Sequence, residues 1–87
     1  MFDWDAANRA HIRQHGFTEE EAEAAWLDPN HIPADATGLG SEWREAIIGM
    51  TRGGRLLHVV WTERAGRIRL FEARKPTRRE ARLYLRR

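Results

Sequence analysis

Three closely spaced segments in the second half of the chain alternate apolar and polar residues, and they most constrain the fold. They read WREAIIGM (43–50), RLLHVVWTE (55–63) and RIRLFEA (67–73). Alternation with a period of two is typical of β-strands. The links between the segments, Arg52-Gly53-Gly54 and Ala65-Gly66, are favourable hairpin turns. Two consecutive hairpins predict an antiparallel meander of three strands.

The part of the chain before residue 31 has the period of an α-helix instead. The spacing predicts a first helix from Asp5 to His15, with Asp3 or Asp5 as its N-cap and Gly16 just past its end. One face of this helix carries Trp4, Asn8, His11, Ile12 and His15. A second helix follows within FTEEEAEAAWLDPN (17–30). Its start has the capping-box pair Thr18 and Glu21, its apolar stripe is Ala22, Ala25 and Trp26, and Asp28-Pro29-Asn30 ends it.

The remaining segments complete the predicted order of elements. Residues 31–42 are rich in Pro and Gly, and only His31–Pro33 is compatible with a short edge strand. Pro76-Thr77 ends the third strand of the meander. Thr77 and Glu80 form a second capping box, which begins a helix over about Arg78 to Leu85.

The predicted order of elements is two helices, three or four strands and a final helix, which is typical of the α+β class. It predicts one two-layer domain over residues 1–87, in which helices cover one face of an antiparallel three- to four-stranded sheet.

Composition excludes several classes of protein. A hydrophobic content of 41% allows one modest core, and the four Trp, one per predicted element, are better placed for core packing than for stacking on bases. The chain has no Cys, so it has neither disulfides nor a thiolate zinc site. No apolar run is long enough for a membrane span or a signal peptide. We therefore expect a cytoplasmic protein that does not associate with a membrane.

Charge is distributed unevenly along the chain although the formal net charge is only +2. From Arg64 onward there are ten Lys or Arg and two acids, whereas the first 63 residues carry five basic and eleven acidic side chains. A field of one sign attracts polyanions or an acidic partner. Fourteen of the fifteen basic residues are Arg, which suits bidentate phosphate binding. The same preference arises in a GC-rich genome, which encodes Arg in place of Lys.

Four stretches together resemble the BrnT-type toxins, a branch of the RelE-like ribonuclease toxins of bacterial type II toxin–antitoxin modules. They are WDAANRAHIRQHG, FTEEEAEAAW, IIGMTRGGRLLHVVWTERAGRIRLFEAR and PTRREARLY. The similarity runs from Phe2 to Tyr84. It implies a small ribonuclease fold, an acidic antitoxin encoded alongside, and binding of operator DNA only through the toxin–antitoxin complex. Two positions differ from the commoner family residues. This chain has Gln14 where many members have Lys, and Glu72 where many have Ser.

The segment from Arg64 onward, called the basic end below, contains the groups that RNA cleavage needs. A base must accept the 2′-OH proton, a cation must stabilise the developing phosphorane, and an acid must protonate the leaving oxygen. Arg69 and Arg74 can clamp the phosphate, Glu80 or a histidine can be the base, and Tyr84 can donate a proton or stack on a base. The side chains expected to hold the RNA backbone are Lys75, Arg78, Arg79 and Arg82.

Each of these residues also has a structural interpretation. Glu80 is a helix cap in that reading, and the arginines form a solvated face. His11 and His15 have the i, i+4 spacing of zinc ligands, but no third ligand is evident. We expect packed, hydrogen-bonded imidazoles there, with neither metal nor cofactor. His58 shares a strand face with Leu56 and Val60, which favours a structural or surface role.

Glu72 raises a separate hypothesis. Strict alternation places Glu72 on the face of Ile68 and Leu70, and Ala73 on the other. A carboxylate at the margin of the core needs a partner. Arg74, two residues on, is one candidate, and an arginine of the last helix is another. Such a pair would hold Arg74 away from a phosphate.

Three functions remain open on this basis. The first is an endoribonuclease toxin that cleaves mRNA through 2′-OH attack without a metal and is neutralised by a cognate antitoxin. The second is a non-catalytic module of the same fold, which binds the antitoxin, nucleic acid or both. The third is a plain RNA- or DNA-binding domain.

Overall fold

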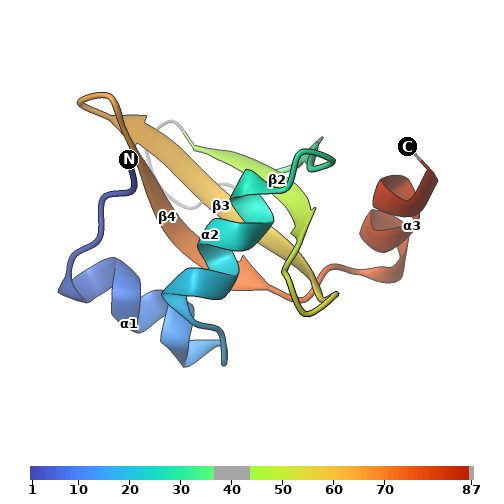
Figure 1. Cartoon of the computed structure of the whole chain (residues 1–87), viewed down its shortest axis with the longest axis horizontal. Helices are drawn as coiled ribbons and strands as arrows, with labels where there is room; N and C mark the ends of the chain where they lie inside the picture. The colour runs from blue at the N-terminus through green and yellow to red at the C-terminus, as the bar shows by residue number, and fades with distance from the viewer. Residues whose placement is uncertain (37–43, 87) are drawn as a thin grey trace.

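The computed structural model describes residues 1–36 and 44–86 of the chain. Its elements are α1 (Ala6–Gln14), α2 (Glu19–Leu27), β1 (Ile32–Ala34), β2 (Glu45–Met50), β3 (Leu56–Arg64), β4 (Arg67–Arg74) and α3 (Arg78–Arg86). The four strands form one antiparallel sheet in the order β1-β2-β3-β4. The predicted α+β class, the meander and the short first strand are therefore confirmed. Figure 1 shows α1 and α2 on one face of the sheet and α3 apart from them.

Side-chain caps begin the helices where the sequence predicted. The backbone N–H of Asn8 donates to Asp5 Oδ1 at 2.9 Å, and the Asp5 N–H donates to Asn8 Oδ1 at 2.7 Å. The same reciprocal bonds join Thr18 and Glu21. Each box satisfies backbone donors that the first helical turn leaves unpaired. Asp5, and not Asp3, is thus the N-cap of α1.

The core lies between α1, α2 and the sheet. Ile12 of α1 and Ala25 of α2 pack on Leu57, Val59 and other apolar side chains of the strands. At Gly49 the backbone of α2 comes so close to β2 that a Cβ would overlap the carbonyl oxygen of Ala25. A residue without a side chain is required for this approach.

Tryptophan side chains border this core. Trp26 makes edge-to-face contacts with Phe2 and Trp61, with ring centroids 5.7 and 5.5 Å apart. Trp4 also packs against the core and donates its Nε1–H to Glu23 Oε2 at 2.7 Å. The predicted packing role is confirmed for these three residues, and Trp43 lies outside the described residues.

The prediction for the α1 histidines is wrong. Asn8 and Ile12 are buried, but His11 and His15 are exposed to solvent. The core of this small domain needs only a narrow stripe of the nine-residue helix, and His11 and His15 lie beside it. Within residues 1–36 and 44–86 no group of three or more His, Asp or Glu side chains is arranged to hold a metal ion.

A β-bulge overturns the predicted faces of β4. Trp61 pairs with Leu70 and Val60 pairs with Glu72, so Phe71 is an extra residue in the ladder. The bulge reverses the alternation after Leu70. Ala73, and not Glu72, therefore joins Leu70 in the core, while Glu72 lies on the opposite face.

Two other features complete the fold. Residues at the N-terminus run parallel to β4, where the Asp3 N–H donates to the Ile68 carbonyl at 2.8 Å. The β3–β4 turn holds Ala65 and Gly66 at φ of 53° and 75°, as a two-residue hairpin turn of this kind requires. None of the helices in the described parts of the chain is long and apolar enough to cross a membrane.

Candidate functional site

Arg74 and Glu80 are joined by two parallel hydrogen bonds where β4 gives way to α3. Arg74 Nη1 donates to Glu80 Oε1 and Nη2 donates to Oε2, both at 2.9 Å. Glu80 Oε1 also accepts the backbone N–H of Thr77 at 2.8 Å. The capping box predicted for Thr77 and Glu80 is therefore present, and the same carboxylate also binds Arg74. A bidentate arginine–carboxylate pair is among the strongest hydrogen-bonded contacts that two side chains form.

The pair changes the acidity of Glu80. The hydrogen bonds from Arg74, helped by the Thr77 N–H, lower the pKa of the Glu80 carboxyl from 4.5 to about 2, although partial burial opposes the change. Glu80 is consequently ionised at neutral pH but a weak base while Arg74 holds it.

His58 completes this cluster from the neighbouring strand. Its side chain is 1% exposed, and its Nε2 lies 3.0 Å from the Asp35 carbonyl oxygen and 3.7 Å from Glu80 Oε2. A carbonyl oxygen only accepts hydrogen bonds, so Nε2 carries the hydrogen. His58 faces Arg74 directly across the β3–β4 ladder. The sequence showed the face of His58 but not this register, which is why the contact with Glu80 was missed.

The structure does not bring Arg69 to Arg74. Arg69 Nη1 donates to Asp3 Oδ2 at 3.1 Å, and Nη2 donates to Asp5 Oδ2 at 2.9 Å. Hydrogen bonds to Asp5 and Asp3 raise the pKa of the Arg69 guanidinium. With 9% of its surface exposed, Arg69 joins the N-terminal segment to β4 and its charge is neutralised there.

Tyr84 lies one helical turn beyond Glu80, on the inward side of α3. It is 2% exposed, and its hydroxyl donates to Asp28 Oδ2 at 2.6 Å. The same oxygen accepts the backbone N–H of Met50 at 2.8 Å. Asp28 thus fastens α3 to β2 and to the end of α2. Tyr84 is part of this anchor.

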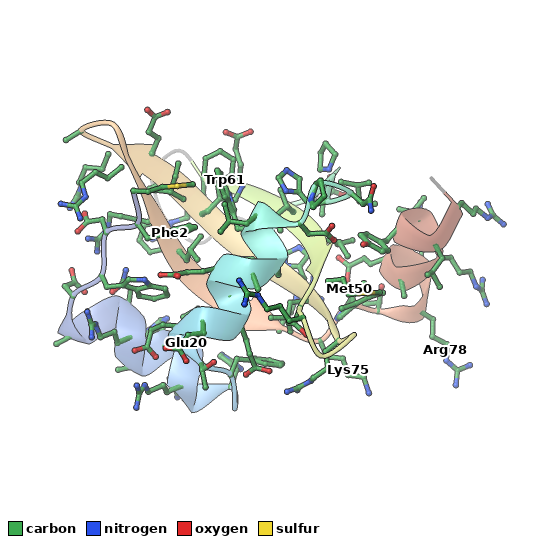
Figure 2. The ribbon with its side chains drawn as sticks, viewed as in Figure 1. Phe2, Glu20, Met50, Trp61, Lys75 and Arg78 are labelled. Atoms are coloured by element: carbon green, nitrogen blue, oxygen red, sulfur yellow. The ribbon has the colours of Figure 1, made fainter. Side chains whose placement is uncertain are left out.

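The predicted RNA-backbone cations are all exposed. Lys75 lies in the link between β4 and α3, and the others lie along the outer side of α3: Arg78, Arg79 and Arg82. Figure 2 shows Lys75 and Arg78 at the start of α3, on the side of the molecule away from Trp61. The basic end predicted from the sequence therefore presents its charge to solvent beside the Arg74–Glu80 pair.

Glu72 takes no part in this cluster. It pairs with Val60 in the sheet, and its side chain has no hydrogen bond or ion pair among the described residues. The hypothesis of a Glu72–Arg74 pair, or of one with an arginine of the last helix, is wrong, because Arg74 is bound to Glu80 instead. The bulge at Phe71 and the capping geometry at Thr77 together account for the difference.

Comparison with known proteins supports the resemblance seen in the sequence. Residues 4–80 match the family model of the ribonuclease toxin BrnT of type II toxin–antitoxin systems. The matched region includes both Arg74 and Glu80. A search of curated proteins gives no match to the chain. Since the family model covers most of the sequence and the fold has the elements that the resemblance implied, the chain belongs to the BrnT family of ribonuclease toxins of type II toxin–antitoxin systems.

Proposed function

We propose that this chain is an endoribonuclease toxin that cleaves mRNA by 2′-OH attack without a metal. The observation that carries the proposal is the Arg74–Glu80 pair, which lies beside exposed cations in a member of a ribonuclease toxin family. The pair combines a group that binds phosphate with a group that accepts a proton.

The first step is an exchange of partners at Arg74. A phosphodiester presents two oxygens that can accept a bidentate arginine, as a carboxylate does, so it competes with Glu80 for the guanidinium. Arg74 is 38% exposed and can be reached from solvent. When Arg74 turns to the phosphate, Glu80 loses the contact that most lowers its pKa. The pKa of Glu80 then rises towards its usual value, and the carboxylate becomes a better base.

Glu80 then accepts the proton of the 2′-hydroxyl. The 2′-oxygen forms a bond to the adjacent phosphorus while the bond from phosphorus to the 5′-oxygen breaks. Arg74 stabilises the charge on the phosphorane oxygens. The leaving 5′-oxygen takes a proton from water, and the hydroxide that remains takes the proton from Glu80. The products are a 2′,3′-cyclic phosphate and a 5′-hydroxyl end.

Other predicted residues have supporting roles in this proposal. Lys75, Arg78, Arg79 and Arg82 attract and hold the RNA backbone, and this binding weakens as salt rises because phosphate contacts release counterions. His58 is buried, so it acts on the substrate only through Glu80 and is a positioning residue. Arg69 and Tyr84 hold the N-terminal segment and α3 in place.

The family also bears on partners and place of action. A type II system pairs its toxin with an antitoxin protein, so membership implies such a partner. We propose that the antitoxin neutralises the chain, that operator DNA is bound only by the complex of the two, and that the substrate RNA places the activity in the cytoplasm.

RNA cleavage by the purified, antitoxin-free chain tests the proposal. We expect cleavage of single-stranded RNA in EDTA, with 2′,3′-cyclic phosphate ends. Arg74→Ala should lower the rate at least about 100-fold, as expected when the group stabilising a developing oxyanion is removed. Arg52→Ala, which removes an exposed arginine of the β2–β3 turn, is the matched control and should keep the rate.

Intact RNA from a folded protein would contradict this function. It would favour the alternative of a non-catalytic module that binds the antitoxin or nucleic acid. One observation supports that alternative: in the present arrangement Arg74 and Glu80 neutralise each other. Circular dichroism of each variant separates loss of cleavage from loss of fold.

A further inference from the structure

A groove with an apolar floor lies beside the Arg74–Glu80 pair, between the start of β3 and the start of α3. Its floor is formed by Phe17, Leu56, Pro76 and Ala81, and its volume is about 520 Å³. Phe17 is largely buried in the core, so the floor is fixed by the fold. Clefts of this size with apolar walls and few polar groups are typical of small-ligand sites.

Cations line the rim of the same groove. Lys75 and Arg78 are exposed, and neither side chain has a hydrogen bond or ion pair in the described part of the chain. Arg55 on the opposite side is already engaged, because its guanidinium lies 4.6 Å from the centre of the Phe17 ring and 3.0 Å from Glu21 Oε2. Two free cations therefore flank an apolar surface.

The groove adjoins the Arg74–Glu80 pair through the link between β4 and α3. The Lys75 carbonyl oxygen accepts a hydrogen bond from Arg74 Nη1 at 3.1 Å. Thr77 lines the groove, and its Oγ1 accepts the backbone N–H of Glu80 at the start of α3. A chain whose phosphate lay at Arg74 would thus reach the groove with its neighbouring residue.

We propose that this groove is the subsite for the nucleotide next to the cleaved phosphodiester. Its base lies against Phe17, Leu56 and Ala81, and its phosphate lies between Lys75 and Arg78. Stacking against an apolar surface suits any base, while the phosphate uses the two free cations. An acidic peptide would use the cations but gains little from the floor. The inference rests on the proposed ribonuclease function.

Binding of two short probes tests the subsite. The first is a 2′-O-methyl RNA tetranucleotide, which lacks the attacking hydroxyl and stays intact. The second is its abasic counterpart, with the same phosphates. Ala81→Leu fills the floor with a good helix former, and Ala81→Met is a second variant of similar size. We expect either to weaken binding of the base-bearing probe about tenfold and that of the abasic probe less than twofold.

Charge removal on the rim provides the complementary comparison. Lys75→Ala and Arg78→Ala should each weaken both probes about three- to tenfold. Arg86→Ala is the matched control, since Arg86 is an exposed arginine of the same helix, does not line the groove and is not among the side chains expected to hold the RNA backbone. It should change binding less than twofold. Equal losses from Arg78→Ala and Arg86→Ala would overturn the subsite and indicate binding to the general field of α3.

Two further outcomes separate this inference from the function it rests on. If the tetranucleotide binds as expected but unmodified RNA stays intact, the subsite stands and the nuclease function fails. If RNA is cleaved and Arg74→Ala abolishes cleavage, yet Ala81→Leu leaves the ratio of the two probe affinities unchanged, the subsite fails alone. Competition by a Glu-rich peptide that Ala81→Leu weakens equally would assign the groove to an acidic protein segment and overturn the proposal.

Discussion

The guanidinium of Arg74 and the carboxylate of Glu80 face each other with both N–O distances at 2.9 Å, so the two groups best suited to phosphate chemistry are bound to each other. The pair fixes the start of α3 relative to the end of β4. It also keeps Glu80 ionised and weakly basic. Structure and chemistry are therefore coupled here, because any anion that binds Arg74 in place of Glu80 also changes the pKa of Glu80.

Acid should weaken the fold through Glu80. Its folded pKa of about 2 lies below the usual 4.5, so the pair contributes stability above pH 4.5 that is lost as the pH falls towards 2. We expect a contribution of about 2 kcal/mol, less than the full conversion of the pKa difference because water partly screens Arg74. Unfolding of the wild type and of Glu80→Gln between pH 2 and 7 measures it. The side-chain oxygen of Gln still accepts the Thr77 N–H, so this variant removes the negative charge of Glu80 and keeps the cap.

The exposed Glu20→Gln is the control for this titration and should keep the pH dependence of the wild type. If Glu80→Gln also follows the wild type between pH 2 and 4.5, the Arg74–Glu80 pair does not persist in solution.

Gly49→Ala should be strongly destabilising. Its Cβ would overlap the Ala25 carbonyl oxygen, and neither backbone can move without shifting α2 from β2. Overpacking of this kind costs about 3 kcal/mol in free energy of unfolding. Gly53→Ala is a matched control in the β2–β3 turn, since its nearest atom would be Thr51 Oγ1 at 3.9 Å. Chemical denaturation should show a change of less than about 0.5 kcal/mol for the control. Equal effects at both glycines would mean that α2 does not lie so close to β2.

Asp28 and Tyr84 should be coupled in stability. Asp28→Ala leaves the Met50 N–H and the Tyr84 hydroxyl without their shared acceptor, and we expect a loss of about 3 kcal/mol. Tyr84→Phe removes only one donor and should cost about 1 kcal/mol. The double variant should therefore be more stable than the sum of the two losses predicts, by about 1 kcal/mol. Additive losses would show that the hydroxyl and the carboxylate do not interact.

Hydrogen exchange gives an independent readout of the same anchor. Asp28→Ala should speed exchange of the amides in α3 more than those in α1, because the Tyr84 hydroxyl of α3 donates to Asp28. Similar acceleration in both helices would indicate general loss of stability instead.

Glu72→Ser should have little effect on Arg74. Glu72 lies opposite Val60 and has no ion pair among the described residues, while Arg74 is held by Glu80. We expect a change of less than about 0.5 kcal/mol in the free energy of unfolding and less than threefold in RNA affinity. Glu80→Gln, which weakens the hold on Arg74, is the comparison and should change affinity more. A larger effect from Glu72→Ser would revive a direct influence of Glu72 on the phosphate site.

Local sequence determined most of the secondary structure. The pairs Asp5 with Asn8, Thr18 with Glu21 and Thr77 with Glu80 are three residues apart, so their geometry depends only on the chain entering a helix. Alternation of side chains and the glycine-containing turns gave the strands and their meander for the same reason. Arg74 and Glu80 are only six residues apart, and the sequence named both of them.

Tertiary structure decided how the side chains meet. The bulge at Phe71 follows from packing between neighbouring strands, and it moved Ala73 inward and Glu72 outward. The contacts of Arg69 with Asp3 and of Tyr84 with Asp28 join residues 66 and 56 positions apart. Periodicity carries no information about such pairs, because it describes one element at a time. Strand register and helix docking set which charges become neighbours. They decided that Arg74 is held by Glu80, while the side chains of Lys75 and Arg78 have no ion pair with any residue that the structure describes.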